Sequence, residues 1–285
     1  MGWKKRLVRG YRKFVLGRFV RTVAAGGLRP FLVDGEGVWF PTKHGFSVLC
    51  NFQDRILELD VNPVWEAMET AFVLANVHPG DVFIDVGANI GYFSMLAAQR
   101  QPSLVLAVEP VGRTFNVLSC NVRHNGLDAV IHPVNVALGS RASTVRLVST
   151  RGPKNHVEYA VGGNDQGAEK VDAKLTTLDS LLKEPGSPAK VDFIKVDIEG
   201  YEYEFLQGAR ETIGRFKPMM LMEVEQHRLE KFGVRASDVF EFLAKLGYRY
   251  LCVRDDAVVP AGVLEEDLTR GRDFVFYTAA HKPVY

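Results

Sequence analysis

From residue 81 onward, short and continuously apolar runs alternate with segments in which apolar residues recur at helical spacing. The apolar runs read VFIDV, LVLAVEP, AVIHPVNVAL, VDFIKVDIE, PMMLMEVE, YRYLCV and DFVFYTA. The helical segments between them cover residues 90–99, 114–124, 202–212 and 237–246. Because strands buried on both faces lack polar alternation, this pattern predicts an α/β fold with a mostly parallel sheet and helices on both faces. The last two runs leave no room for a crossover helix, which predicts an antiparallel pair at one edge.

The residues before this alternation predict two further parts of the chain. Short apolar runs within residues 31–61, VWF, FSVLC and RILELD, are separated by turn-forming residues and predict a small β-rich lead-in. A helical pattern over residues 64–75 opens the main domain. Inside that domain, the glycines and polar residues of 150–167 predict a long loop. We therefore divide the chain into residues 1–30, 31–61 and 62–285.

The first part, residues 1–30, has the pattern of a basic amphipathic helix. Apolar residues recur at spacings of three and four from Trp3 to Val23, and Lys or Arg fills most positions between them. Docking of residues 3–23 on an anionic membrane surface or another acidic partner fits this pattern. Packing on the acidic remainder of the same chain and a targeting address are the alternatives.

Composition and charge narrow the class of protein. The chain has 285 residues, of which 47% are hydrophobic and 24% are charged, which is typical of a globular protein and excludes disordered and collagen-like chains. Nine of the 35 basic residues and none of the 34 acidic residues lie within residues 1–33. This leaves 26 basic against 34 acidic residues elsewhere, so the net charge of +1 combines a segment of +9 with a body of −8.

The cysteines and the hydropathy indicate the compartment. Cys50, Cys120 and Cys252 are isolated and odd in number, which favours reduced thiols over a disulfide framework. The sequence contains no uncharged apolar run of about 18 residues, the length that a membrane span requires. We expect a cytoplasmic protein that associates peripherally with the inner membrane face if its basic segment binds lipid.

A glycine turn between a strand and a helix is the first candidate binding site. The segment VFIDVGANIGYFSMLA passes from an apolar strand through Gly87 and Gly91 into a helix. Such a turn places free backbone N–H groups at the carboxyl edge of the sheet, where open α/β folds bind ligands. The G-x-x-x-G spacing matches neither the dinucleotide fingerprint nor the phosphate loop, which disfavours NAD and ATP. Glu109 follows the next strand, where an acidic residue accepts hydrogen bonds from ribose hydroxyls.

Carboxylates at the ends of two later strands form the second candidate site. Asp197 and Glu199 leave the strand FIKV and, being two residues apart, are expected on one face. Like charges this close raise the pKa of one carboxyl, which suits a general base. Binding the cofactor or capping the next helix is the alternative role of Asp197. Glu223, Glu225 and His227 end the following strand at the same edge, and His227 is a further candidate base. Strand alternation explains these acids without a metal ion.

Four segments in order carry a resemblance to a known family. DVGANIGYFS, AVEP, NVALG and IKVDIEGYE resemble the successive motifs of S-adenosylmethionine-dependent methyltransferases of the FkbM type. The resemblance covers residues 62–225, and IKVDIEGYE is its most specific part. It implies a Rossmann-like class I methyltransferase fold with a seven-stranded sheet, a catalytic domain at residues 62–285, and S-adenosylmethionine as cofactor.

The resemblance also implies roles for individual residues. Those that it places around the methionine moiety of the cofactor are Asp85, Gly87, Asn89 and Gly91. Glu109 is expected to hold the ribose, and Asn135 and Val136 to flank the adenine. Asp197 is a candidate for both cofactor binding and catalysis. Glu66 lies where family members have a glutamate in the helix before the glycine turn, so it is included among the candidate cofactor-binding residues.

The expected acceptor atom is an oxygen. No Asn-Pro-Pro-Tyr or Asp-Pro-Pro-Tyr segment follows the strand FIKV, although that arrangement is associated with methylation of planar nitrogens. Together with the resemblance, this favours methylation of a hydroxyl by direct SN2 transfer. The expected acceptor is a small molecule, a glycan or a lipid-linked acceptor, such as a sugar, a glycolipid or a related metabolite. The alternatives are an RNA or protein methyltransferase that docks through its basic segment, and a binding module without activity. The acidic body disfavours nucleic acid as a partner.

Overall fold

The computed structural model describes residues 31–33, 37–51, 66–149, 157–158, 169–254, 257–260, 268 and 272–285. The chain separates into two compact units, Met1–Trp65 and Glu66–Tyr285. The basic helix expected at residues 3–23 lies outside the described residues, as does the apolar run at 55–60, so docking on an anionic membrane stays a prediction. No helix within the described ranges has the length and apolar character that a membrane crossing requires.

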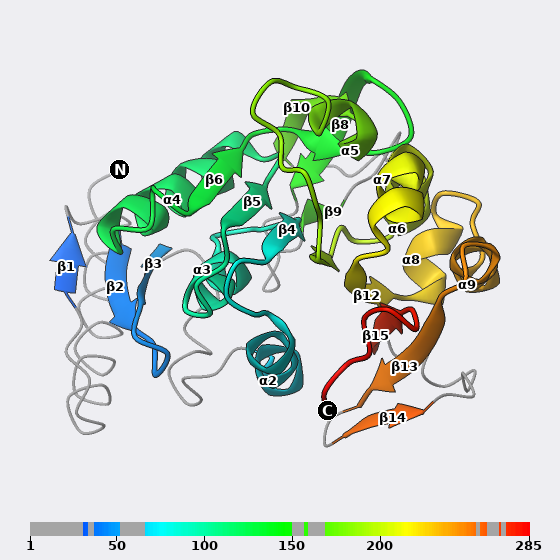
Figure 1. Ribbon diagram of the computed structural model, residues 1–285. Coiled ribbons are helices and arrows are strands. Elements are labelled where there is room, and N and C mark those ends of the chain that lie inside the picture. Colours follow the sequence, from blue (N-terminus) through cyan, green and yellow to red (C-terminus); the bar gives the residue numbers. More distant parts are fainter. Residues whose placement is uncertain are drawn as a thin grey trace. The chain divides into compact units, whose positions relative to one another are not determined.

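The described part of the first unit is a three-stranded antiparallel sheet. Its strands are β1 (Phe31–Val33), β2 (Gly37–Pro41) and β3 (Ser47–Asn51), which pair in that order (Figure 1). The apolar runs VWF and FSVLC, predicted as strands, therefore lie in β2 and β3. Trp39, Phe46 and Val48 are buried, as the apolar pattern of this segment requires.

An eight-stranded sheet with the order β14-β13-β15-β12-β11-β4-β5-β6 forms the centre of the second unit (Figure 1). Five neighbouring strands are parallel: β6 (Ile131–Val134), β5 (Leu104–Val108), β4 (Val82–Val86), β11 (Phe193–Val196) and β12 (Met219–Val224). The chain order reverses between β4 and β11. Open α/β sheets bind their ligands at such a reversal, outside the carboxyl ends of the strands.

The remaining strands complete one side of the sheet. β15 (Arg272–Tyr277) runs antiparallel between β12 and β13 (Arg249–Val253), and β14 (Val258–Pro260) pairs antiparallel with β13. The predicted Rossmann-like α/β fold and its antiparallel pair, β13 with β15, are confirmed. The sheet has eight strands where seven were expected, because β14 adds a short edge strand that ends at a proline.

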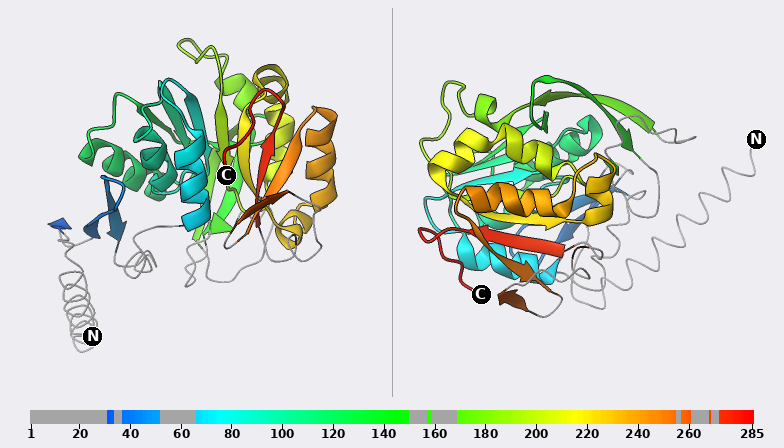
Figure 2. Two further views of the ribbon diagram at one scale, coloured as in Figure 1. Left: turned by 60° about the horizontal axis from the view of Figure 1, so that its bottom comes forward. Right: turned by 90° about the vertical axis from the view of Figure 1, so that its right-hand side faces the viewer.

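Helices cover both faces of this sheet. They are α2 (Ala67–Asn76), α3 (Tyr92–Ala98), α4 (Gly112–His124), α5 (Leu178–Leu181), α6 (Glu202–Gly208), α7 (Arg210–Phe216), α8 (Gln226–Glu230) and α9 (Ala236–Lys245). Figure 2 shows α6 and α7 on one side of the sheet and α2 on the other. Side chains along β11 alternate accordingly: Phe193 lies against Phe72 of α2, whereas Ile194 belongs to the core that includes Phe205 of α6.

Two predicted elements are divided in the structure. The run AVIHPVNVAL forms β6 and then β7 (Ala137–Leu138), which belongs to a second sheet. The other strands of that sheet are β8 (Ser143–Ser149), β9 (Val157–Glu158) and β10 (Glu169–Thr176), in the order β7-β10-β8-β9. β9 lies within the segment predicted as a loop. The helix predicted over 202–212 is interrupted at Ala209, between α6 and α7.

Gly208 lies at this interruption and packs on the chain that follows β7. A Cβ at position 208 would lie 1.9 Å from the carbonyl oxygen of Gly139. We expect Gly208→Ala to lower the free energy of unfolding by about 2–3 kcal/mol, because the backbone must move to relieve the overlap. In the control variant, Gly214→Ala in α7, the added Cβ meets no heavy atom within 4 Å. This control should gain up to about 1 kcal/mol from helix propensity. Urea unfolding measures both changes, and equal effects would contradict the packing.

Candidate active site

The glycine turn joins β4 to α3 through residues 87–91. Gly87, Asn89 and Gly91 have positive φ angles of 80°, 51° and 90°. The N–H groups of Gly87 and Ala88 both donate to the carbonyl of Val108, at 3.0 and 2.9 Å, which ties the turn to β5. A Cβ at position 87 would lie 2.0 Å from the carbonyl oxygen of Asp197. Gly87 is therefore required by the close approach of two backbone segments as well as by its conformation.

Glu109, at the end of β5, supports the same turn. Its buried carboxylate accepts hydrogen bonds from the N–H groups of Asn89, at 3.0 Å, and Val111, at 2.9 Å. Burial raises the pKa of Glu109 to about 7, although these two hydrogen bonds favour the ionised form. The predicted ribose-binding residue thus lies beside the glycine turn, at the carboxyl edge of the sheet.

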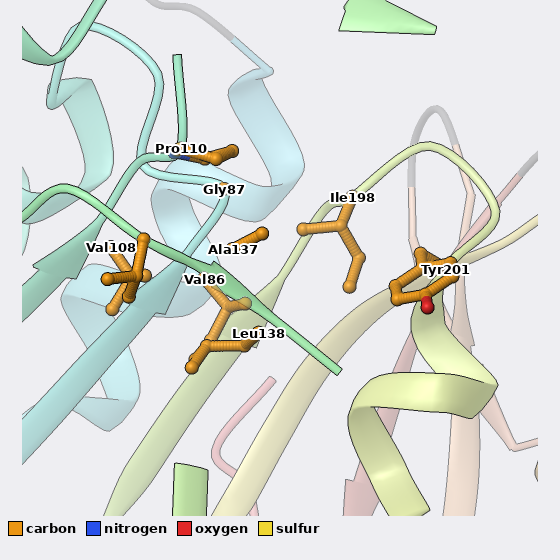
Figure 3. A pocket seen from close by; sticks show the side chains of 9 residues that line it. Val86, Gly87, Val108, Pro110, Ala137, Leu138, Ile198 and Tyr201 are labelled. Carbon is orange, nitrogen blue, oxygen red and sulfur yellow. The ribbon is translucent and has the colours of Figure 1, made fainter. Parts of the chain in front are cut away.

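An apolar pocket lies at this edge, on the α6 side of the sheet. The residues that line it are Val86, Gly87, Val108, Pro110, Val136, Ala137, Leu138, Ile198 and Tyr201. In Figure 3, Ile198 and Tyr201 lie across the pocket from Val108 and Pro110. Asn135, predicted to flank the adenine, donates through Nδ2 to the carbonyls of Glu109, at 2.8 Å, and Pro110, at 3.0 Å. Its amide group therefore holds one wall of the pocket in place.

Charged side chains line the opposite, α3 side of the same edge. Lys195 pairs with Asp85 in the strand register, and both side chains are buried. The Nζ of Lys195 lies 3.1 Å from Oδ2 of Asp197 and 4.5 Å from the ring centroid of Phe93. Burial lowers the pKa of Lys195, but the carboxylates around it, of which Asp197 acts most strongly, raise it above its usual range. Lys195 is therefore a buried cation, not a base.

The carboxyl groups near Lys195 differ in their environments. Asp85 accepts a 2.6 Å hydrogen bond from Ser94, and burial raises its pKa while Lys195 opposes the shift. Glu66 lies just before α2 and acts electrostatically on Lys195. Burial raises the pKa of Asp273 well above its usual range. Asp197 is the more accessible partner, because 33% of its side chain is exposed against 4% for Lys195.

Arg228 in α8 contacts acidic side chains from the ends of two neighbouring strands, β11 and β12. Its guanidinium contacts Glu199 and Glu225 and donates to Glu223 at 3.1 Å. Burial and then the charge of Asp197 raise the pKa of Glu223, while this hydrogen bond stabilises its ionised form. Glu199 has φ 60° and follows the end of β11, so the alternation that put it on one face with Asp197 no longer applies.

His227, the other predicted catalytic residue, contacts Glu225 and has 59% of its side chain exposed. The structure thus brings Asp197 next to the glycine turn and places Glu199 and His227 in a separate group around Arg228. Sequence reasoning assigned no site role to Arg228, Asp273 or the buried Lys195. Lysine within a continuously apolar run was the one available signal, since a cation in a buried strand requires carboxylate partners.

Comparison with known proteins identifies the family. Residues 85–250 match the methyltransferase FkbM domain, and this segment is more than half of the chain. The chain belongs to the FkbM methyltransferase family. The resemblance found in the sequence motifs is thereby confirmed, and S-adenosylmethionine is the methyl donor of this FkbM domain.

Several relatives share this similarity. Methyltransferase sdnD of Sordaria araneosa is 33% identical over 165 residues, which cover 48% of this chain and 64% of the relative. Hexuronic acid methyltransferase AglP of Haloferax volcanii is 25% identical over 174 residues, which cover 61% of this chain and 65% of the relative. The crystal structure of an FkbM methyltransferase from Methylobacillus flagellatus aligns with a TM-score of 0.46 and 16% identity, over 78% of this chain and 53% of that one. The matches thus span less than two thirds of each of these proteins.

The observed geometry fits the cofactor of the FkbM family. An apolar pocket adjoins a buried carboxylate, Glu109, at the chain reversal of the sheet. Apolar walls suit an adenine ring, and a carboxylate suits the ribose hydroxyls.

The buried Lys195 generates a prediction about stability. Lys195→Met leaves Asp85, Asp197 and Asp273 without their shared cation, so we expect a loss of about 3–5 kcal/mol in the free energy of unfolding at pH 8. Burial raises the pKa of Asp85 and Asp273 in the folded state and Lys195 opposes both shifts, so without Lys195 the folded chain should bind these protons at higher pH than the wild type does. Its deficit should therefore shrink as the pH falls from about 8 to 5.

Lys190→Met is the matched control for this variant. Lys190 pairs with Asp192 at 2.9 Å, but half of its side chain is exposed. The control should lose less than about 1 kcal/mol, with little dependence on pH. Urea unfolding at several pH values measures both variants. A small, pH-independent effect of Lys195→Met would contradict the assignment of Lys195 as the shared counter-ion.

Proposed function

We propose that this FkbM methyltransferase transfers a methyl group to a hydroxyl oxygen of a sugar, a glycolipid or a related metabolite. The observation that carries the proposal is the position of Asp197. Its backbone carbonyl lies against Gly87 of the glycine turn, and its partly exposed carboxylate is held by the buried Lys195. A carboxylate at that place is available to accept the proton of an attacking hydroxyl.

The cofactor roles follow from the same edge of the sheet. S-adenosylmethionine, when bound, supplies an electrophilic methyl group on a sulfonium. In our proposal, Glu109 accepts hydrogen bonds from the ribose hydroxyls, and the apolar pocket holds the adenine with Val136 on one wall. The turn that contains Gly87, Asn89 and Gly91 surrounds the methionine moiety. Asp85 acts indirectly, since its carboxylate is occupied by Ser94 and faces Lys195.

Among the three candidate bases, the contacts favour Asp197. Lys195 holds Oδ2 of Asp197 at 3.1 Å, and 33% of the Asp197 side chain is exposed. Glu199 is engaged by Arg228, and His227 by Glu225. Asp197 is itself ion-paired with Lys195, so what favours it is its position against Gly87 together with its exposed fraction.

The hydroxyl acceptor is supported by two further observations. After β11 the chain continues as Asp197-Ile198-Glu199-Gly200, without the paired prolines associated with methylation of planar nitrogens. One relative, AglP, is by its name a methyltransferase of hexuronic acid, which is a sugar derivative. The first observation disfavours a planar nitrogen as the acceptor atom, and the second supports a sugar derivative as the acceptor.

The proposed role of Glu109 predicts a pH-dependent affinity for the cofactor product. Ribose hydroxyls donate to the ionised form, and the pKa of Glu109 in the free protein is about 7. The affinity for S-adenosylhomocysteine should therefore be full at about pH 8 and fall below pH 7. Glu109→Gln should weaken binding by about 10- to 100-fold and remove the pH dependence. Titration calorimetry measures the pH dependence and the effect of the substitution, with the exposed Glu184→Gln as control. Unchanged affinity in Glu109→Gln would exclude ribose binding by Glu109.

Identification of the product tests the reaction itself. With labelled S-adenosylmethionine and fractions of glycans, glycolipids and small polyols, mass spectrometry should find the label on an acceptor oxygen. Asp197→Asn should lower turnover by about 100- to 10,000-fold, the usual contribution of a general base. Its affinity for S-adenosylhomocysteine should stay within threefold of wild type, and Glu211→Gln, at an exposed position, should have normal turnover. Label on RNA, on a protein side chain or on a nitrogen would contradict the proposal, as would full activity of Asp197→Asn.

A further inference from the structure

Glu202 is a buried carboxyl that the proposed reaction does not use. It is the first residue of α6 and only 1% exposed. Its Oε1 accepts hydrogen bonds from the N–H groups of Gly200, at 3.0 Å, and Ile198, at 3.3 Å. The carboxyl therefore reaches back from the helix to the loop that connects β11 to α6.

This loop, residues 197–201, requires such a support. Two consecutive residues, Glu199 and Gly200, have left-handed φ angles of 60° and 107°. A non-glycine residue in this conformation is strained and persists only where its surroundings fix it. Gly200 is also packed against α8, since a Cβ there would lie 2.7 Å from the carbonyl oxygen of Arg228. The two N–H groups that donate to Glu202, those of Ile198 and Gly200, lie on either side of the strained Glu199.

The loop carries residues of both halves of the site. Asp197 is the first residue of the loop, and its N–H donates a 3.0 Å hydrogen bond to the carbonyl of Val86 in the sheet. Ile198 and Tyr201 form the wall of the apolar pocket across from Val108 and Pro110 (Figure 3). A shift of the loop would move the pocket wall and the candidate base together.

We propose that Glu202 is a positioning residue whose carboxyl oxygen fixes the loop of residues 197–201, so that the pocket wall and Asp197 are held in register with the glycine turn. The proposal rests on the assignment of the apolar pocket to the adenine under the proposed function. Glu202 touches neither cofactor nor acceptor in this role and acts through the N–H groups of Ile198 and Gly200. Burial, partly opposed by these hydrogen bonds, raises its pKa to about 7, and the neighbouring charges that act on it are Asp197 and Glu223. Both the ionised and the protonated carboxyl retain an oxygen that can accept the two hydrogen bonds.

The test compares variants that keep or remove this acceptor oxygen. Glu202→Gln keeps it without the charge, Glu202→Met removes it at similar size, and Glu202→Asp withdraws it while the charge remains. We expect the dissociation constant for S-adenosylhomocysteine to rise at least tenfold in Glu202→Met and Glu202→Asp. It should stay within threefold of wild type in Glu202→Gln and in the exposed control Glu211→Met. This binding measurement needs no methyl-acceptor substrate. Its result is therefore independent of whether that substrate is methylated on a hydroxyl.

Hydrogen exchange separates positioning from general destabilisation. The amides of Ile198 and Gly200 should lose protection in Glu202→Met and Glu202→Asp and keep it in Glu202→Gln, whereas protection in β4 and β5 should be unchanged in all variants. Wild-type affinity in both loss variants, or an equal loss in Glu202→Gln, would overturn the role of Glu202. Absence of binding by the wild-type chain would instead overturn the assignment of the pocket, and with it this proposal.

Discussion

The rest of the site depends on one close backbone contact, the approach of the Asp197 carbonyl to Gly87. The contact joins the ends of β4 and β11 at the place where the chain order of the sheet reverses. Because no side chain fits between them, the glycine turn and the loop after β11 behave as one surface at the carboxyl edge. Hydrogen bonds extend this surface to Glu109, just after β5, and to Glu202, the first residue of α6.

The two sides of this sheet edge differ in polarity: one is apolar and the other carries buried charges. On the α6 side, an apolar pocket is formed by strand ends and by Ile198 and Tyr201. On the α3 side, a buried lysine compensates several carboxyl groups and leaves one of them, Asp197, partly exposed. Buried charges are costly unless they are paired, so this arrangement is more readily explained by a function than by stability. It concentrates ionisable groups beside the position expected for the reacting methyl group.

The sequence predicted the features that arise from local patterns. The α/β alternation, the glycine turn and the acid at the end of β5 each follow from residues close together in the chain. Lys195 and Asp197 are two residues apart and meet at 3.1 Å, a relation consistent with strand geometry although Lys195 was assigned no site role from the sequence. The separation of Glu199 from Asp197 was not predictable in this way, because it depends on one residue with a positive φ just after the strand ends. Asp273 reaches Glu223 only because β15 inserts between β12 and β13, a tertiary pairing without a local signal.

A crystal structure of the chain with S-adenosylhomocysteine would show directly whether the contact between Gly87 and Asp197 organises a methyl-transfer site. We predict the adenine between Val136 and Ile198, the ribose hydroxyls at Glu109, and the sulfur beside Gly87 facing the Asp197 carboxylate. A ligand whose ribose lies away from Glu109, or whose sulfur is turned away from Asp197, would contradict it.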